Sequence, residues 1–342
     1  MKIAIDAMGG DNAPEAVIIG SIQARDEYNL GIILSGKEIE IKRILEKNTS
    51  NFNNIELINA EDIISNDDKP VLAIRRKKDS SMVKALYAVK EGKADAIVSA
   101  GSTGALLSGG TLLVGRIKGI ERPAIGSLIP CIAGGFCLLI DSGANVDSKP
   151  EFLYDFAIMG DIYLKRVMNI SSPRIALANI GTESSKGNKL TVETYELLKN
   201  SHLDLNFTGN IEARDILKGE ADIVVCDGFT GNMILKTMEG TVQELMNGLK
   251  AEIMAGMRSK IGGVLIKPAL KNFKRKFDYS EHGGAPLLGV KAPVIKAHGS
   301  SNAKAIKNAI RQAKICCESN VNELIEQSIM RRWMMCLKEL RN

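Results

Sequence analysis

Small polar residues and glycines gather in short segments that each follow a run of apolar, β-branched residues. The segments are DAMGGDNAP, AGSTGALLSGG, DSGANVDSKP, NIGTESSKGN, TGNIEARD, DGFTGN and HGSSNA. Turns of this composition present backbone N–H groups and helix N-termini, which attract anions. Any one of them is ordinary turn chemistry. If the apolar runs are parallel strands, however, the segments meet at one edge of a sheet, and together they predict a site for a phosphate-sized anion.

Two carboxylates and one histidine in these segments could take part in chemistry. Asp6 and Asp11 flank the Gly9–Gly10 turn, where they either cap the first helix or orient the site and accept a proton from monohydrogen phosphate. His298 is either an ordinary turn histidine or a phosphate ligand and proton carrier, since an unperturbed imidazole titrates near neutral pH.

Hydroxyl and amide side chains in the same segments could bind the anion directly. Ser102 and Thr103 are the hydroxyl donors expected at the turn after the fourth strand. The other candidates for the rim of the site are Gly101, Gly104, Asn145, Asn179, Glu183, Asn210, Asp227 and Gly231.

Motifs for several other chemistries are missing from the sequence. It contains no G-x-x-x-x-G-K-[ST], no G-x-G-x-x-G after the first strand, no G-x-S-x-G and no H-E-x-x-H, and it has three histidines in all. A reaction in which phosphate is the nucleophile needs none of these motifs. It needs a cradle for phosphate and donors for the oxyanion of a thioester. No H-E-x-x-H motif or Cys/His cluster suggests a metal site.

The elements that must position these segments alternate along the chain. Apolar runs that end in Gly, Asp or Asn predict strands at 2–6, 31–36, 55–60, 95–101, 136–141, 174–181, 205–210, 222–228 and 292–299. Helical patterns lie between them at 14–27, 38–47, 81–90, 150–168, 190–199, 231–257 and 302–327. This alternation predicts a three-layer α/β/α fold with a mainly parallel, doubly wound sheet and an antiparallel excursion at 123–137. We expect one domain over residues 1–327 and a variable C-terminal tail over 328–342.

Composition and charge exclude several classes of protein. Aromatic residues make up 4% of the chain, which argues against a stacking platform for nucleic acid. Six cysteines at spacings that fit no zinc site indicate reduced thiols in the cytoplasm. The N-terminus lacks the features of a secretory signal, and no run of about 18 apolar residues predicts a membrane span.

A basic, amphipathic segment predicts a helical hairpin that projects from the domain at about 245–285. Residues 258–276 carry seven basic residues and no acidic one, against a net charge of +5 for the chain. We expect Gly262–Gly263 and Pro268 to interrupt the helix. The segment either packs in a dimer or lies on the anionic inner face of the cell membrane. In the second case the contact residues are Ile261, Val264, Leu265, Lys267, Lys271 and Phe273.

Taken in order, the motifs DAMGGD, RRKKDSSM, AGSTGAL, GRIKGIERPA, DSGANVDSKP, NIGTE, KGN, TGNIEARD, DGFTGN and KAPVIKAHGSS closely resemble the phosphate acyltransferase family of bacterial phospholipid synthesis. The resemblance implies a fold similar to phosphotransacetylases and isocitrate-dehydrogenase-like enzymes. It also implies a homodimer that reversibly transfers a long-chain fatty acyl group from acyl carrier protein to inorganic phosphate, with no metal and no organic cofactor. The acyl phosphate would then pass to a membrane-bound glycerol-phosphate acyltransferase.

The resemblance also gives weight to two side chains with plainer interpretations. Lys186, otherwise a solvated loop lysine, would contact phosphate or the carbonyl group. Asn232, otherwise an N-terminal helix cap, would donate to phosphate or the oxyanion. With His298 these form the expected catalytic set. The acidic carrier protein would dock on the basic run at 75–78 or on the 258–276 segment.

Two other functions stay open at this point. A short-chain phosphotransacetylase-like enzyme would use an acyl-CoA and would not need the amphipathic segment. A scaffold that binds membranes or DNA is supported by the basic stretch alone, and the sequence contains no helix-turn-helix motif.

Overall fold

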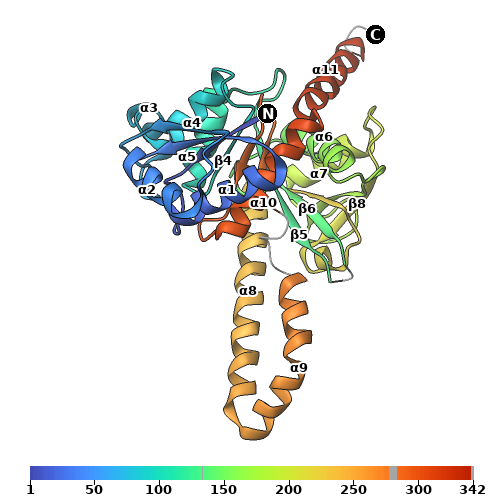
Figure 1. The fold of residues 1–342 in the computed structure, drawn as a ribbon. Coiled ribbons are helices and arrows are strands. Elements are labelled where there is room, and N and C mark those ends of the chain that lie inside the picture. The colour runs from blue at the N-terminus through green and yellow to red at the C-terminus, as the bar shows by residue number, and fades with distance from the viewer. Residues whose placement is uncertain (133, 277–282, 340–342) are drawn as a thin grey trace.

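The nine apolar runs predicted as strands are all strands in the computed structural model of the chain, which describes residues 1–132, 134–276 and 283–339 (Figure 1). The strands are β1 Lys2–Asp6, β2 Gly31–Gly36, β3 Ile55–Asn59, β4 Ala96–Ser99, β5 Ala124–Pro130, β6 Phe136–Ile140, β7 Ile175–Asn179, β8 Phe207–Glu212, β9 Ile223–Val225, β10 Ala285–Leu288 and β11 Val294–Lys296. β5 and β6 form the antiparallel excursion expected at 123–137. β10 was not predicted, because its four residues follow a glycine-rich stretch without a repeating pattern.

The eleven strands form one sheet in the order β3-β2-β1-β4-β11-β10-β5-β6-β9-β7-β8. Most neighbouring strands are parallel, but β10 is antiparallel to β11 and to β5, and β5 is antiparallel to β6. These reversals make β6, β9, β7 and β8 run against β1 to β4 and β11. The carboxyl ends of the strands therefore do not all lie at one edge of the sheet. The expectation from the sequence, that they share one edge, was wrong.

Helices cover both faces of the sheet, and the three-layer α/β/α prediction is confirmed (Figure 1). The helices are α1 Glu15–Tyr28, α2 Glu38–Asn48, α3 Pro70–Arg76, α4 Ser81–Lys90, α5 Thr103–Gly109, η1 Gly110–Val114, α6 Pro150–Val167, α7 Lys189–Lys199, η2 Ala213–Lys218, α8 Gly228–Ala255, α9 Met257–Lys276, α10 Ala303–Glu318 and α11 Val321–Glu339. One buried cluster joins the sheet to α1, α6 and α10, and another joins it to α4 and α5. Because both faces are covered, β1 and β4 are largely buried and mostly apolar, and their buried polar residues, Asp6 and Ser99, stand at the strand ends.

α8 and α9 form an antiparallel arm that extends away from the sheet (Figure 1). The chain turns at Gly256, whose N–H donates to Ser259 Oγ at 3.1 Å. The expected interruptions at Gly262–Gly263 and Pro268 were wrong, since α9 continues through all three residues. Gly263 instead allows close packing, because a Cβ there would overlap Ile253 on α8. The last part of the predicted projection lies outside the described residues.

The predicted tail begins within α11, which extends away from the end of α10 (Figure 1). Arg332 on this helix forms an ion pair with the buried carboxylate of Asp155 on α6 and stacks over the Tyr154 ring at 5.7 Å. Residues beyond position 328 therefore pack on the domain at this point. The division into a domain over 1–327 and a tail over 328–342 remains a proposal.

Candidate active site

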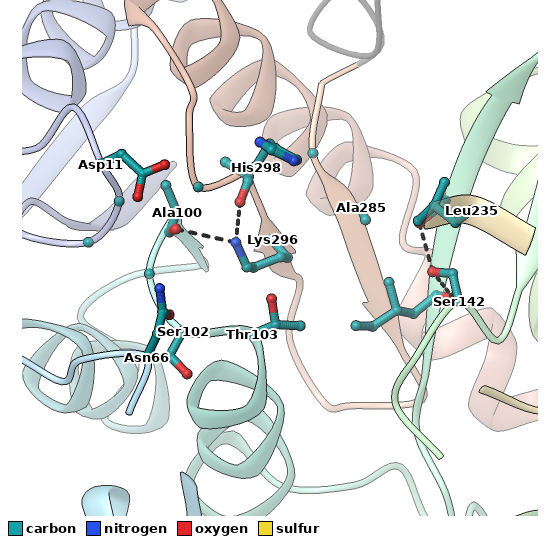
Figure 2. A pocket seen from close by; sticks show the side chains of 18 of the residues that line it. Asp11, Asn66, Ala100, Ser102, Thr103, Ser142, Leu235, Ala285, Lys296 and His298 are labelled. Atoms are coloured by element: carbon teal, nitrogen blue, oxygen red, sulfur yellow. Dashed lines mark hydrogen bonds between the residues drawn. The ribbon is translucent and has the colours of Figure 1, made fainter. Parts of the chain in front are cut away.

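A pocket of about 600 Å³ lies where the two oppositely directed halves of the sheet meet (Figure 2). The turns after β1, β4 and β11 and the loop before α3 contribute one side of it. Strand β5, Ser142 after β6, and the first turns of α8 contribute the other side. Segments that are about 290 residues apart in sequence, such as Met8 and His298, line the same cavity. A pocket between two structural halves is a common place for a ligand.

The buried carboxylate of Asp6 lies behind the polar end of this pocket and holds the turns that form it. It accepts hydrogen bonds from Ser81 Oγ and Ser99 Oγ, both at 2.6 Å. A Cβ on Gly9 would lie 2.7 Å from the backbone nitrogen of Gly101, so only glycine lets the two turns pack this closely. Burial raises the pKa of Asp6, and the two serine hydroxyls oppose that rise. Asp6 does not line the pocket or cap α1; it holds the turns that do line it.

Some of the backbone amides expected to bind the anion are already used within the protein. The Asp11 N–H donates to the carbonyl oxygen of Gly299 at 2.8 Å, and the Gly101 N–H donates to Ser99 Oγ at 3.0 Å. Ser102, Thr103 and the carboxylate of Asp11 line the same end of the pocket (Figure 2). The two amides of Asp11 and Gly101 are therefore not free to bind an anion.

On the other side of the pocket, the buried carboxylate of Asp141 organises the loop after β6. It accepts hydrogen bonds from the backbone N–H groups of Gly143, Ala144 and Asn145 at 3.2, 3.0 and 2.7 Å, and from Asn145 Nδ2 at 2.9 Å. Burial raises the pKa of Asp141, while these donors and the N–H of Ile125 lower it. The amides predicted to face an anion in DSGAN thus face an internal carboxylate.

The loop held by Asp141 supports the start of α8 and thereby the position of Asn232. A Cβ on Gly231 would overlap the Asp141 carbonyl oxygen, so α8 packs directly on the loop backbone. Asp227 caps the helix by accepting the Thr230 N–H at 2.9 Å. Asn232 lines the pocket one turn later. Neither Asn145 nor Asp227 nor Gly231 lines the pocket; all three hold the helix that presents Asn232.

Two of the three predicted catalytic residues, Asn232 and His298, line the pocket, and Lys186 does not. His298 Nδ1 accepts the Ser300 N–H at 3.2 Å and contacts Ser300 Oγ at 2.8 Å. A neutral ring with this acceptor at Nδ1 carries its hydrogen on Nε2. His298 can therefore act as a donor to an anion from Nε2.

Three predicted rim residues, Asn179, Glu183 and Asn210, form a separate group with Lys186 at the ends of β7 and β8. Asn179 Nδ2 donates to the Lys186 carbonyl oxygen at 3.0 Å, and Asn210 Nδ2 donates to the Glu183 carbonyl oxygen at 2.8 Å. None of the four lines the pocket. The reason is strand order, because β7 and β8 lie at the edge of the sheet beyond β6 and β9, whose following residues Ser142 and Asn232 do line the pocket. Gly104 also lies off the pocket lining, where a Cβ would be 2.7 Å from Pro70.

Lys296 is a pocket residue that the sequence analysis did not single out. It is the last residue of β11, and its Nζ donates to the carbonyl oxygens of Ala100, at 3.3 Å, and Ala297 (Figure 2). Burial lowers the pKa of Lys296 to about 8, and Asp6 and Asp11 oppose that shift. The one available signal was a lysine inside an apolar strand, since lysine is rarely buried without a partner.

The chain matches the family described as fatty acid synthesis protein over residues 1–324. Among curated relatives, the phosphate acyltransferase of Clostridium botulinum is 56% identical over 330 residues, covering 96% of this chain and 98% of the relative. The phosphate acyltransferase of Clostridioides difficile is 53% identical over 333 residues, covering 96% of each chain.

Solved structures show the same fold at lower identity. A phosphotransacetylase from Streptococcus pyogenes aligns with a TM-score of 0.62 and 20% identity, covering 93% of this chain and 94% of that one. A branched-chain phosphotransacylase from Enterococcus faecalis aligns with a TM-score of 0.57 and 16% identity, covering 93% and 99%. The expected similarity of fold to phosphotransacetylases is confirmed.

Proposed function

Because the chain belongs to the phosphate acyltransferase family, we propose that it reversibly transfers a long-chain fatty acyl group from acyl carrier protein to inorganic phosphate. The chain is an acyltransferase of fatty acid and phospholipid synthesis. The observation that carries the proposal is the mixed lining of the pocket. Its polar end holds Ser102, Thr103 and Lys296, and its walls include the apolar side chains of Ile64 and Leu235. This suits a small anion meeting an acyl group.

The reaction needs only that phosphate and thioester be held together. An oxygen of monohydrogen phosphate attacks the thioester carbonyl carbon, a C–O bond forms and the C–S bond breaks. The proton of the phosphate passes to the departing thiolate, which leaves as a thiol. We assign donation to the carbonyl oxyanion to Asn232, and donation to phosphate to His298 Nε2 and the hydroxyls of Ser102 and Thr103. Lys186 remains a prediction, since it lies outside the pocket lining.

A basic surface next to the pocket supports an acidic carrier protein as the acyl donor. Arg75, Arg76 and Lys78 on and after α3 are exposed. Lys77 between them donates to the Ile63 carbonyl oxygen at 2.9 Å and to Asp68 at 2.8 Å, which ties α3 to the loop that lines the pocket. A carrier docked on α3 would stand beside the pocket mouth, and complementary charge would steer it there.

The tip of the α8–α9 arm supports attachment to the anionic inner face of the cell membrane. Ile261, Val264 and Leu265 on α9 are 65%, 71% and 78% exposed, and Met257 at the turn is 77% exposed. Contiguous exposed apolar side chains mark an interaction site, and Lys267, Lys271 and Phe273 follow on the same helix. None of the helices in the described ranges is long and apolar enough to cross a bilayer. Membrane contact would let a homodimer deliver the acyl phosphate to a membrane-bound glycerol-phosphate acyltransferase.

The assay for this function incubates the protein with palmitoyl acyl carrier protein and phosphate, and traps acyl phosphate with hydroxylamine. We expect phosphate-dependent release of the carrier thiol, and weaker activity with acetyl-CoA. A preference for acetyl-CoA would assign the protein to the short-chain phosphotransacetylase reaction instead. An Arg75→Glu, Arg76→Glu variant should raise KM for the carrier and leave KM for phosphate unchanged. If the folded protein forms no acyl phosphate from any donor, the proposed function is wrong.

A further inference from the structure

The side chain of Lys296 ends in the polar end of the pocket with one hydrogen-bond donor left over (Figure 2). An ammonium group has three N–H donors. Two of them are accounted for by the carbonyl oxygens of Ala100 and Ala297. Within the described ranges no third acceptor lies within hydrogen-bonding distance of Nζ. The two carbonyls therefore fix the direction of the side chain and leave its third N–H for a ligand.

The charge of Lys296 is incompletely balanced within the protein. Asp6 and Asp11 act on it electrostatically, yet neither lies within ion-pair distance of Nζ. Burial disfavours the charged form and lowers the pKa of Lys296 to about 8. An anion that reached Nζ would stabilise the ammonium group, because a nearby opposite charge favours the charged form. The carbonyl groups of Ala100 and Ala297 orient the buried ammonium group, and a bound anion would balance its charge.

The other lysine of the pocket lining, Lys236, is more exposed than Lys296 and already has a charged partner. The side chain of Lys236, on α8, is 56% exposed, and it already forms an ion pair with Glu239 at 2.7 Å. Solvation and pairing weaken its attraction for a further anion. Within the described lining of the pocket, Lys296 is therefore the lysine suited to hold phosphate.

We propose that Lys296 Nζ binds the attacking phosphate through its free N–H, and that it is a catalytic residue of this chain. This inference rests on the proposed function, and it adds a residue to the site assigned there. Phosphate would lie between Nζ and the hydroxyls of Ser102 and Thr103, which line the same end of the pocket (Figure 2). The ammonium group would neutralise part of the phosphate charge and direct one oxygen toward the thioester.

The first test compares three variants in the acyl phosphate assay. Lys296→Met removes the charge and the donors, and Lys296→Gln keeps donors for the two carbonyl oxygens without the charge. Lys236→Met removes a pocket lysine that is solvated and paired. We expect KM for phosphate to rise roughly 10- to 100-fold in both Lys296 variants, the equivalent of one charge-assisted hydrogen bond. Lys236→Met should change it less than about threefold. Unchanged KM for phosphate in folded Lys296→Gln would overturn the inference.

The second test measures sulfate binding by calorimetry, because the charge of sulfate stays constant over the pH range used. The charged and titratable groups around Nζ are Asp6 on β1, Asp11 after it, Lys236 and Glu239 on α8, and His298 after β11. Lys296→Gln retains all five, so it separates their titration from that of Lys296. Wild-type affinity should fall roughly 6- to 20-fold from about pH 7.5 to about pH 9.5, given a pKa of about 8 and a roughly 10- to 100-fold weaker neutral form.

The two tests separate failure of this inference from failure of the proposed function. The same fall in sulfate affinity in Lys296→Gln as in the wild-type protein would show that another group binds the anion. Acyl transfer by the wild-type protein would then still support the proposed function. If the wild-type protein binds sulfate through Lys296 but forms no acyl phosphate from any donor, the anion site stands and the proposed reaction does not.

Discussion

Replacing Asp141 with asparagine tests whether one buried carboxylate holds the loop on which Asn232 depends. Asp141 Oδ1 accepts the N–H groups of Ile125 and Gly143, and Oδ2 accepts the Asn145 N–H at 2.7 Å and Asn145 Nδ2 at 2.9 Å. In Asp141→Asn, an amide oxygen can take the place of Oδ1. The amide nitrogen then faces the two donors of Asn145, which lose their acceptor.

The size of the effect follows from those two donors. A buried donor without a partner costs about 1–3 kcal/mol, so Asp141→Asn should lower the free energy of unfolding by about 2–6 kcal/mol. With an unfolding entropy of about 2.1 cal/mol/K per residue, a chain of 342 residues loses roughly 1.4 °C of Tm per kcal/mol. We therefore expect Tm to fall by about 3–8 °C. Calorimetry at neutral pH measures this directly.

A matched control lies in the same loop–helix junction. Asp227 caps α8 by accepting the Thr230 N–H at 2.9 Å, and Asn188 and Asn302 make the equivalent cap on α7 and α10. Asp227→Asn should thus cost less than about 1 kcal/mol. If Asp141→Asn melts within about 1 °C of the wild-type protein, the carboxylate does not organise the loop. Asn232 would then owe its position to contacts other than those of Asp141.

Two further predictions concern the arm and the C-terminal helix. Gly263→Ala should destabilise the packing of α9 on α8, because the new Cβ overlaps Ile253. Gly262→Ala places its Cβ where no atom lies within 4 Å, so it should stabilise the helix by up to about 1 kcal/mol. Amide hydrogen exchange of the arm measures both effects, and equal protection in the two variants would contradict the packing. Burial raises the pKa of Asp155 to about 7 against the pull of Arg332. Arg332→Met should raise this pKa further, so its loss of Tm should grow as pH rises above about 7, when the unpaired carboxylate must ionise. Exposed Arg331→Met is the control, and a pH-independent loss in Arg332→Met would refute the mechanism.

Much of the fold followed from local patterns. Nine strands and the principal helices were predicted because both faces of the sheet are covered, so that strands such as β1 and β4 are mostly apolar and end in polar residues. β10 and α3 were missed because four and seven residues are too short to show a period. The helix interruption placed at Gly262–Gly263 failed because Gly263 packs closely against Ile253 on α8, which offsets the low helix propensity of glycine. α9 also continues through Pro268, and no contact in the structure explains why.

The order of residue types alone showed which turns carry polar groups, and three of the residues predicted from it, Ser102, Asn232 and His298, line the pocket. Which turns meet depends on the order of the strands in the sheet. β10 pairs with β5, which is far away in the chain, and β7 and β8 lie at the edge of the sheet beyond β6 and β9. Local sequence does not contain this order, so it cannot separate the loop of Lys186 from the loop of Ser102. The environment of Lys296 is likewise tertiary, because its carbonyl partner at Ala100 and its carboxylate neighbours reach it only through the folded sheet.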